Sequence, residues 1–333
     1  MNYDSIHWCL KCNLATVSRR CPVCRCEASK LKADPHSEIV PMFGNDLSFF
    51  RNKTDERYGE GCGHLLLPKE STPFILRSRD RNQIVVNGGI VGKAHPDRAS
   101  LNVSGLSIIS KNLTKNIVRC DHDSSYFVKK GRNLMVTGVT ECTPGLKVGD
   151  KVVILDDRNT PIASGTMRMN AEDMGSDRGV AVVVRHTERP RFSEDVKGHG
   201  WKDTLKLNAS TVSSAVGMAA KDLKALHLSY GYPVVIDLTS DISSEAILLI
   251  ALGAGLKPKA FLKKDDEFSR FLAEKHGLEI IDSYPEKCLL LTEDQHTDVI
   301  AHSPIRDWDP AMVWMYVMIK AEPFDPVYLK GFL

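Results

Sequence analysis

An alternation of short apolar runs with helical segments after residue 233 most constrains what this chain can fold into. Val234–Leu238 is an apolar, β-branched run, and a helix-forming segment follows it after a turn of small residues. The pattern repeats and predicts, in order, strand Val234–Leu238, helix Ser243–Ala254, strand Lys259–Leu262, helix Glu267–His276 and strand Leu278–Asp282. Strands that alternate with helices indicate a doubly wound parallel sheet, whose ligand crevice lies at the carboxyl ends of the strands.

The turn after the first of these strands would lie at that crevice, with a helix N-terminus aimed at any bound phosphate. Nucleotide cradles of this layout normally carry glycines, which let the backbone approach a phosphate, and a lysine that neutralises it. This turn has neither, and Ile242 stands among its polar residues Thr239, Ser240, Asp241, Ser243 and Ser244. We therefore predict a degenerate nucleotide loop.

A long helix is predicted before the sheet, from about Asp203 to Tyr230. Its apolar residues recur at helical spacing, at Val212, Ala215, Val216, Ala219, Leu223 and Leu226.

Five of the nine cysteines lie before residue 27. Two Cys-x-x-Cys pairs, Cys9 with Cys12 and Cys21 with Cys24, have the spacing of a closed four-sulfur site for structural zinc. Cys26 is a spare thiol and His7 a weaker candidate ligand. The alternatives are a redox Cys-x-x-Cys or free buried thiols. The spacing favours a zinc ribbon over residues 1–30, which by itself does not indicate a function.

Residues 31–113 are interrupted by prolines and predict a small α+β segment without a chemical role. A hairpin is expected around Asn87-Gly88, since this dipeptide is a strong turn signal between apolar runs. Cys62 and His64 lack a second ligand pair, so a structural role is favoured over a metal site.

Short strands with turn signals recur over residues 114–192 and predict a small β-barrel. The strands are Asn116–Arg119, Lys151–Leu155, Thr160–Thr166 and Val180–Arg185, with a tight turn at Asp156–Asn159. This segment resembles the PUA domain, an RNA-binding module of tRNA- and rRNA-modifying proteins. The matching pieces are Gly131–Met135, Gly138-Val139, Gly149-Asp150, Ile162–Gly165 and Arg178–Val182.

The PUA resemblance implies RNA contacts around the short helix before the first glycine motif and on a neighbouring strand edge. The basic side chains there, which suit phosphate contacts, are Lys129, Lys130, Arg132, Arg178 and Arg185. The alternative is an ordinary solvated surface on a barrel that binds protein. Charge supports RNA, because residues 1–113 hold 16 cations against 11 acids and residues 114–192 hold 13 against 10, whereas residues 193–333 hold 15 against 21.

The C-terminal part resembles the PP-loop ATP-pyrophosphatase family, and within it the phosphoadenosine phosphosulfate (PAPS) reductase branch. The family's Ser-Gly-Gly-Lys-Asp-Ser turn falls on Thr239–Ser244. Further agreement lies in Ala246–Ala251, in Gly277–Ile281, and in Ser303–Tyr316 followed by Pro326–Phe332. Asp309 is a natural N-cap and Pro310 a natural first helical residue. The order of segments resembles an archaeal group of PAPS reductase-like proteins.

This chain departs from that family in three places. Ser240 and Asp241 replace the glycines, and Ile242 replaces the lysine. Only Cys288 lies between Ile281 and Ser303, where the family carries a segment rich in cysteine and basic residues, and the family's further cysteines after the final Lys-Gly phrase are missing. We therefore expect a C-terminus truncated relative to that family.

The predicted architecture is a multidomain α/β protein. Its segments are a zinc ribbon (1–30), a small α+β segment (31–113), a PUA domain (114–192) and an adenine nucleotide α-hydrolase-like, doubly wound domain (193–333).

The favoured function is a non-catalytic, tRNA- or ribosome-associated RNA-binding protein that uses its PUA domain and zinc ribbon to hold structured RNA and carries a PAPS reductase-like pseudoenzyme domain. Structural zinc is its expected cofactor, while ATP or PAPS binding is doubtful. One alternative is an active adenylating or sulfur-transfer enzyme acting on RNA or a sulfonucleotide. Another is a subunit completed by a protein partner on the acidic C-terminal domain. No apolar run reaches eighteen residues and the N-terminus lacks a signal-peptide pattern, so a cytoplasmic protein without membrane contact is expected.

Overall fold

The computed structural model describes residues 5–32, 37–78, 82–95, 99–175, 178–187, 198–293 and 299–322. The chain divides into two compact units, and the first combines the two ends of the sequence. One unit is Met1–Val40 with Trp201–Lys330, and the other is Pro41–Gly200 with Gly331–Leu333. The four segments predicted in sequence order therefore fall into two units, because residues of the predicted ribbon join the C-terminal segment in one unit.

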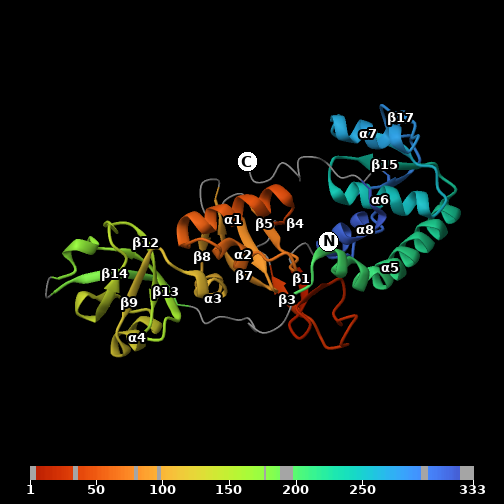
Figure 1. The fold of residues 1–333 in the computed structure, drawn as a ribbon. Helices are drawn as coiled ribbons and strands as arrows, with labels where there is room; N and C mark the ends of the chain where they lie inside the picture. Colours follow the sequence, from red (N-terminus) through yellow and green to blue (C-terminus); the bar gives the residue numbers. More distant parts are fainter. Residues whose placement is uncertain are drawn as a thin grey trace. The chain divides into compact units, whose positions relative to one another are not determined.

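A five-stranded, all-parallel sheet forms the centre of the first unit (Figure 1). Its order is β17 (Ile280–Ile281), β16 (Lys259–Leu262), β15 (Val234–Leu238), β18 (Leu289–Leu291) and β19 (Ile300–His302). All five residues of β15 are buried, as expected for an apolar central strand covered on both faces. The parallel sheet is confirmed, whereas β18 and β19 were not predicted and β17 is shorter than expected.

Four helices accompany this sheet: α5 (Trp201–Tyr230), α6 (Ile242–Gly253), α7 (Glu267–Lys275) and α8 (Pro310–Lys320). Helices α5, α6 and α8 pack against one another, and the buried residues of α5 include Val212, Ala219 and Leu223 of the predicted apolar stripe. Helix α8 begins at Pro310, as predicted. The expected phrase Pro326–Phe332 lies outside the described residues.

The N-terminal residues form a three-stranded antiparallel sheet with the order β2 (Leu14–Thr16), β1 (Ser5–Cys9) and β3 (Ser29–Lys32). This sheet packs on α5 and α8. The buried Asn208 side chain of α5 donates to the Ala15 carbonyl at 3.0 Å and accepts from the Val17 amide at 3.2 Å. The side-chain amide of Asn208 thus pairs with one backbone group in β2 and one just after it, as a neighbouring strand would. Without it these two groups would be buried without partners.

Asp309 begins α8, but its side chain makes no capping hydrogen bond. It lies instead 2.6 Å from Nδ1 of His7 in β1. The predicted N-cap position is therefore correct, while the carboxylate joins the two ends of the chain rather than satisfying the helix amides. The strand β4 (Glu38–Pro41) follows, and the Trp314 indole of α8 donates to the Ile39 carbonyl at 2.9 Å.

The second unit contains the antiparallel strands β5 (Phe74–Arg77), β6 (Asn82–Val86), β7 (Gly89–Ala94) and β8 (Ala99–Leu101), with the helices α1 (Gly44–Tyr58), α2 (Cys62–Leu66) and α3 (Val103–Ile108). The predicted hairpin is present: Asn87 and Gly88 join β6 to β7 with φ of 50° and 76°, as a type I′ turn requires. A short 3₁₀ turn, Ser110–Asn112, leads to the barrel.

The β-barrel of the second unit has the strand order β10 (Leu134–Met135), β14 (Val180–His186), β13 (Pro161–Met167), β12 (Lys151–Leu155), β9 (Ile117–Cys120) and β11 (Val139–Cys142). Helix α4 (His122–Lys129) and the 3₁₀ turns Val136–Gly138 and Ala171–Asp173 complete it. Val153 and Leu155 of β12 belong to the core that buries Phe50 and Ile84. The predicted segments 31–113 and 114–192 therefore share a core.

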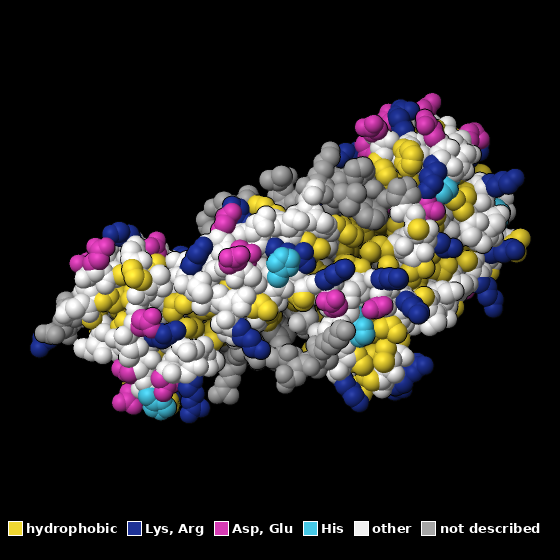
Figure 2. Space-filling model, in the orientation of Figure 1, with side chains coloured by type: hydrophobic (Ala, Val, Ile, Leu, Met, Phe, Trp, Pro, Cys, Tyr) yellow, Lys and Arg dark blue, Asp and Glu magenta, His cyan; other side chains and the backbone are white. Residues whose placement is uncertain are grey.

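No helix among the described residues has the length and apolar character to cross a membrane. On the face drawn in Figure 2, charged side chains of both signs are spread among apolar ones.

Candidate functional site

Helix α4 is fixed to the barrel at both ends. The Asp121 side chain caps its first turn by accepting from the Ser124 amide at 2.7 Å. Gly131, with φ of 82°, ends the helix, and the Arg132 amide then donates to the Phe127 carbonyl. A side chain at Gly138 would lie 2.0 Å from Ser124 Oγ, so the glycine is required for the close packing of α4 on the barrel. The helix is a rigid platform for its exposed side chains.

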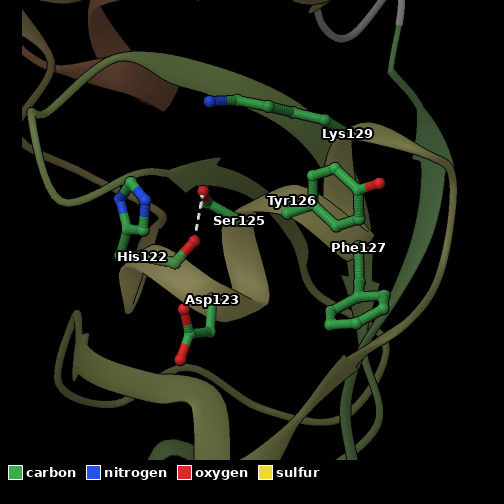
Figure 3. Close-up of a pocket in the computed structure, with 6 residues that line it drawn as sticks. All are labelled: His122, Asp123, Ser125, Tyr126, Phe127 and Lys129. Atoms are coloured by element: carbon green, nitrogen blue, oxygen red, sulfur yellow. Dashed lines mark hydrogen bonds between the residues drawn. The ribbon is translucent and has the colours of Figure 1, made fainter.

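Two aromatic rings are exposed on this polar helix. Tyr126 is 57% exposed and Phe127 is 55% exposed, and their centroids lie 5.5 Å apart with the rings nearly perpendicular. Figure 3 shows the two rings next to one another, with Lys129 extending away from them. Together with His122, Asp123, Ser125 and Lys129 they line an open pocket of about 550 Å³. Two neighbouring rings at this exposure form an apolar patch on a polar helix, which is a surface that a ligand could cover.

The three predicted basic residues near α4 lie together at its C-terminal end, in different environments. Lys129 Nζ lies 3.1 Å from the buried carboxylate of Asp156. Burial raises the pKa of Asp156, but hydrogen bonds from the Thr160 amide, Lys129 and the Arg158 amide outweigh burial and lower it overall. Lys129 therefore holds α4 to the turn after β12 rather than offering a free cation.

Lys130 and Arg132 remain exposed. Lys130 Nζ lies 4.0 Å from the centroid of the Tyr126 ring and 2.5 Å from its hydroxyl oxygen, so this cation lies at the hydroxyl end of the ring and leaves the ring half-exposed. Both side chains are in reach of a ligand that rests on the rings of α4.

Of the two remaining predicted residues, Arg178 lies just before β14 and Arg185 lies near its other end. Arg185 follows Val184, whose amide donates to the Asn133 side chain at 3.2 Å, so Arg185 lies beside the loop that carries Arg132. Arg178 precedes the other end of the strand, where Val180 pairs with Met135. The five predicted residues are thus spread over a strand as well as a helix. Tyr126 and Phe127 were not among the predicted site residues, although two adjacent aromatic residues in a short polar helix can be recognised in the sequence.

The four cysteines predicted as metal ligands lie together. The Sγ atoms of Cys9, Cys12, Cys21 and Cys24 are all within 4.8 Å of one another, and those of Cys9 and Cys24 are 3.5 Å apart. A zinc–sulfur distance of about 2.3 Å in a tetrahedron implies sulfur atoms a little under 4 Å apart, so the cluster could hold a metal such as zinc.

Thiols of the cluster differ in pKa because their surroundings differ. Burial raises the pKa of Cys9 and Cys12, whereas a hydrogen bond from the Cys26 amide lowers the pKa of Cys24 to about 6. Cys24 is therefore thiolate at neutral pH and available to a cation. His7, the weaker candidate, is turned to Asp309, and Cys26 is exposed outside the four-sulfur cluster.

The residues of the predicted nucleotide loop close on one another between β15 and α6. The Thr239 amide donates to Ser244 Oγ at 3.0 Å, and Ser244 Oγ donates to the Asp237 carbonyl at 3.1 Å. The Asp241 amide lies 3.3 Å from Thr239 Oγ1. The Thr239 and Asp241 amides are thus engaged by side chains of the turn itself.

Comparison with known proteins identifies the barrel. Residues 116–187 match the family model of the PUA domain, so the chain contains a PUA domain. The uncharacterized protein MJ0066 of Methanocaldococcus jannaschii is 21% identical over 411 aligned positions, which cover 98% of this chain and 84% of that protein.

Two solved structures are also similar. The hypothetical protein PH0734.1 of Pyrococcus horikoshii is 22% identical, over 46% of this chain and 96% of that one, with a TM-score of 0.39. A conserved PUA domain protein of Thermoplasma acidophilum is 15% identical, over 46% of this chain and 96% of that one, with a TM-score of 0.39.

Proposed function

We propose that this chain is a non-catalytic RNA-binding protein whose PUA domain holds structured RNA on the surface around α4. The observation that carries the proposal is the pair of half-exposed rings, Tyr126 and Phe127, beside the exposed cations Lys130 and Arg132. Aromatic faces stack on nucleobases and cations contact phosphates, so the combination suits RNA better than a purely apolar or purely charged ligand. The PUA match over residues 116–187 supports the same ligand class.

The phosphate contacts fall to Lys130 and Arg132, with Arg185 on the adjoining strand end. Lys129 has a positioning role, since its removal would leave the buried Asp156 without its cation. The resemblance of the barrel to a module of tRNA- and rRNA-modifying proteins makes tRNA and ribosomal RNA the proposed partners.

The C-terminal half is proposed to be a PAPS reductase-like pseudoenzyme. Its turn lacks the glycines and the lysine, and the Thr239 and Asp241 amides are already hydrogen-bonded within the turn. Asp241, within the turn itself, adds negative charge near the place where a phosphate would lie, which disfavours an anion. The four-cysteine cluster is proposed to bind structural zinc. Its four sulfur atoms fill a tetrahedral site, and among the described residues no other metal-binding side chain joins the cluster.

Fluorescence anisotropy with labelled tRNA and rRNA-fragment transcripts tests the PUA interface. The K130E/R132E variant is expected to bind at least tenfold more weakly and to show a smaller dependence of affinity on salt. A Y126A/F127A variant should lose affinity with little change in that salt dependence, because stacking releases no counterions. The matched control is K221E/K224E, the same charge change at exposed lysines of α5 in the other unit. Unchanged binding by both α4 variants would refute the proposed interface.

A further inference from the structure

One side of the N-terminal sheet is used for packing within its own unit. Asn208 of α5 binds the backbone of β2, Leu207 packs on the cysteine cluster, and His7 pairs with Asp309. These contacts fix the ribbon, here meaning residues 5–32, on α5 and α8. Whatever else the ribbon binds must use the side chains that these contacts leave exposed.

Those side chains are predominantly cationic. Between residues 5 and 32 the sequence holds six lysines and arginines and a single acidic residue, Glu27. Five of the cations are exposed in the structure, and we call them the ribbon cations: Lys11, Arg19, Arg20, Arg25 and Lys30. Across the described part of the chain, no carboxylate forms an ion pair with any of the ribbon cations. This contrasts with Lys129 of the PUA domain, which is bound to Asp156.

The metal centre does not cancel this charge. Four thiolates around a zinc ion carry a net charge of about −2, which leaves the ribbon positive by about three charges. The positive charge is also local, since residues 193–333, most of which belong to the same unit, hold 15 cations against 21 acids. A cationic surface on an otherwise acidic unit selects a polyanion rather than proteins in general.

Apolar side chains stand among the ribbon cations. Leu10 is 48% exposed and Val23 is 50% exposed, and each occupies one of the two Cys-x-x-Cys turns. Because the four Sγ atoms lie within 4.8 Å of one another, the two turns that carry these side chains meet at the cysteine cluster. Lys11 directly follows Leu10, and Arg25 lies two residues after Val23. Figure 2 shows this mixture of lysine, arginine and apolar side chains at the place of the ribbon in Figure 1.

We propose that the ribbon cations with Leu10 and Val23 form a second RNA-binding surface of this protein, separate from α4. The cations contact phosphates while the two aliphatic side chains pack on ribose and base, a combination that an acidic protein segment would not need. The choice of RNA as the polyanion rests on the proposed function of the PUA domain. Two surfaces on one chain raise the affinity for an RNA that reaches both, even when each binds weakly.

The R19E/R20E variant tests this inference. These residues lie outside both Cys-x-x-Cys turns, so the four cysteines and the left-handed Arg25 backbone, with φ of 60°, are untouched. In the anisotropy assay we expect about tenfold weaker binding and a salt dependence reduced by about two phosphate contacts. Unchanged metal content and tryptophan fluorescence establish that the ribbon remains folded, and K221E/K224E again controls for charge. An L10S/V23S variant should weaken binding without altering the salt dependence.

The outcomes separate this inference from the proposed function. Wild-type affinity in R19E/R20E would overturn the second surface and leave the α4 interface standing. Weaker binding in R19E/R20E with unchanged binding in the α4 variants would overturn the α4 interface instead. Poly-glutamate at the same charge concentration as the RNA is the competitor. Displacement of the RNA from the K130E/R132E variant by poly-glutamate would reassign the ribbon surface to acidic protein segments and overturn its assignment to RNA.

Discussion

Glu245 should make the stability of the first unit depend on pH in a direction that is unusual for a carboxylate. Its side chain lies in α6 at 1% exposure, and neither carboxylate oxygen has a hydrogen-bond partner among the described residues. Burial and the negative charge of Glu322 outweigh the opposing charge of Lys275 and raise the pKa of Glu245 from 4.5 to about 8. The folded unit therefore holds a proton that the unfolded chain releases above pH 4.5.

The sign follows from proton linkage. Between the two pKa values the native state binds more protons than the unfolded state, so stability falls as pH rises through this range. A difference of 3.5 pKa units corresponds to about 5 kcal/mol in total, of which about 3 kcal/mol is lost between pH 5.5 and 8.5. Glu245→Gln removes the ionisation while keeping the shape of the neutral side chain. The variant should exceed the stability of the wild type by about 1.5 kcal/mol at pH 5.5 and by about 4.5 kcal/mol at pH 8.5.

Urea unfolding followed by tryptophan fluorescence is the assay. All four tryptophans, Trp8, Trp201, Trp308 and Trp314, belong to the first unit, so the signal reports on that unit. The expected gain at pH 8.5 is about 2 M in the urea midpoint. Burial and Lys275 lower the pKa of His276, which also titrates, but that contribution is common to both proteins and cancels in their difference. Equal pH dependence in wild type and variant would refute the reasoning.

Three further predictions concern the same unit. Cys12→Ser should lower bound zinc, measured by elemental analysis, from about one per chain, whereas Cys26→Ser should retain it because Cys26 lies outside the cluster. Asn208→Ala should destabilise the unit by about 2 kcal/mol in the urea assay because it leaves backbone groups of β2 unpaired, while Ser210→Ala on the same helix should have little effect. Millimolar ATP or PAPS should not shift the melting temperature; a rise of several degrees would contradict the closed turn after β15.

The sequence predicted those elements whose own residue types and spacing indicate their structure. The β15 run begins with three β-branched apolar residues and is apolar except for Asp237, and Asn87-Gly88 has the φ preference its turn requires. By contrast, β18 and β19 contribute only three residues each, too few for periodicity to detect. Pairings between distant residues were also invisible, since 302 positions separate His7 from Asp309.

The features of the candidate site also divide into those that the sequence could predict and those that it could not. Spacing alone sufficed for the four cysteines, because two short motifs define a tetrahedron. The basic residues of the PUA domain could be predicted from residue type and position, but whether a given cation is paired with a carboxylate could not. That Lys129 is held by Asp156 depends on the barrel bringing α4 to the turn after β12.

The first unit joins Met1–Val40 to Trp201–Lys330, and this has a consequence for synthesis. The buried face of the ribbon, with Trp8, Leu14 and Ala15, leaves the ribosome long before its partner helices α5 and α8. At about 5 to 20 residues per second, the ribosome needs tens of seconds to reach Pro310. Residues 41–200 are complete in that interval, so the second unit can fold first. The nascent ribbon must wait with its apolar face uncovered, and a metal held by its four cysteines would order it without help from the rest of the chain.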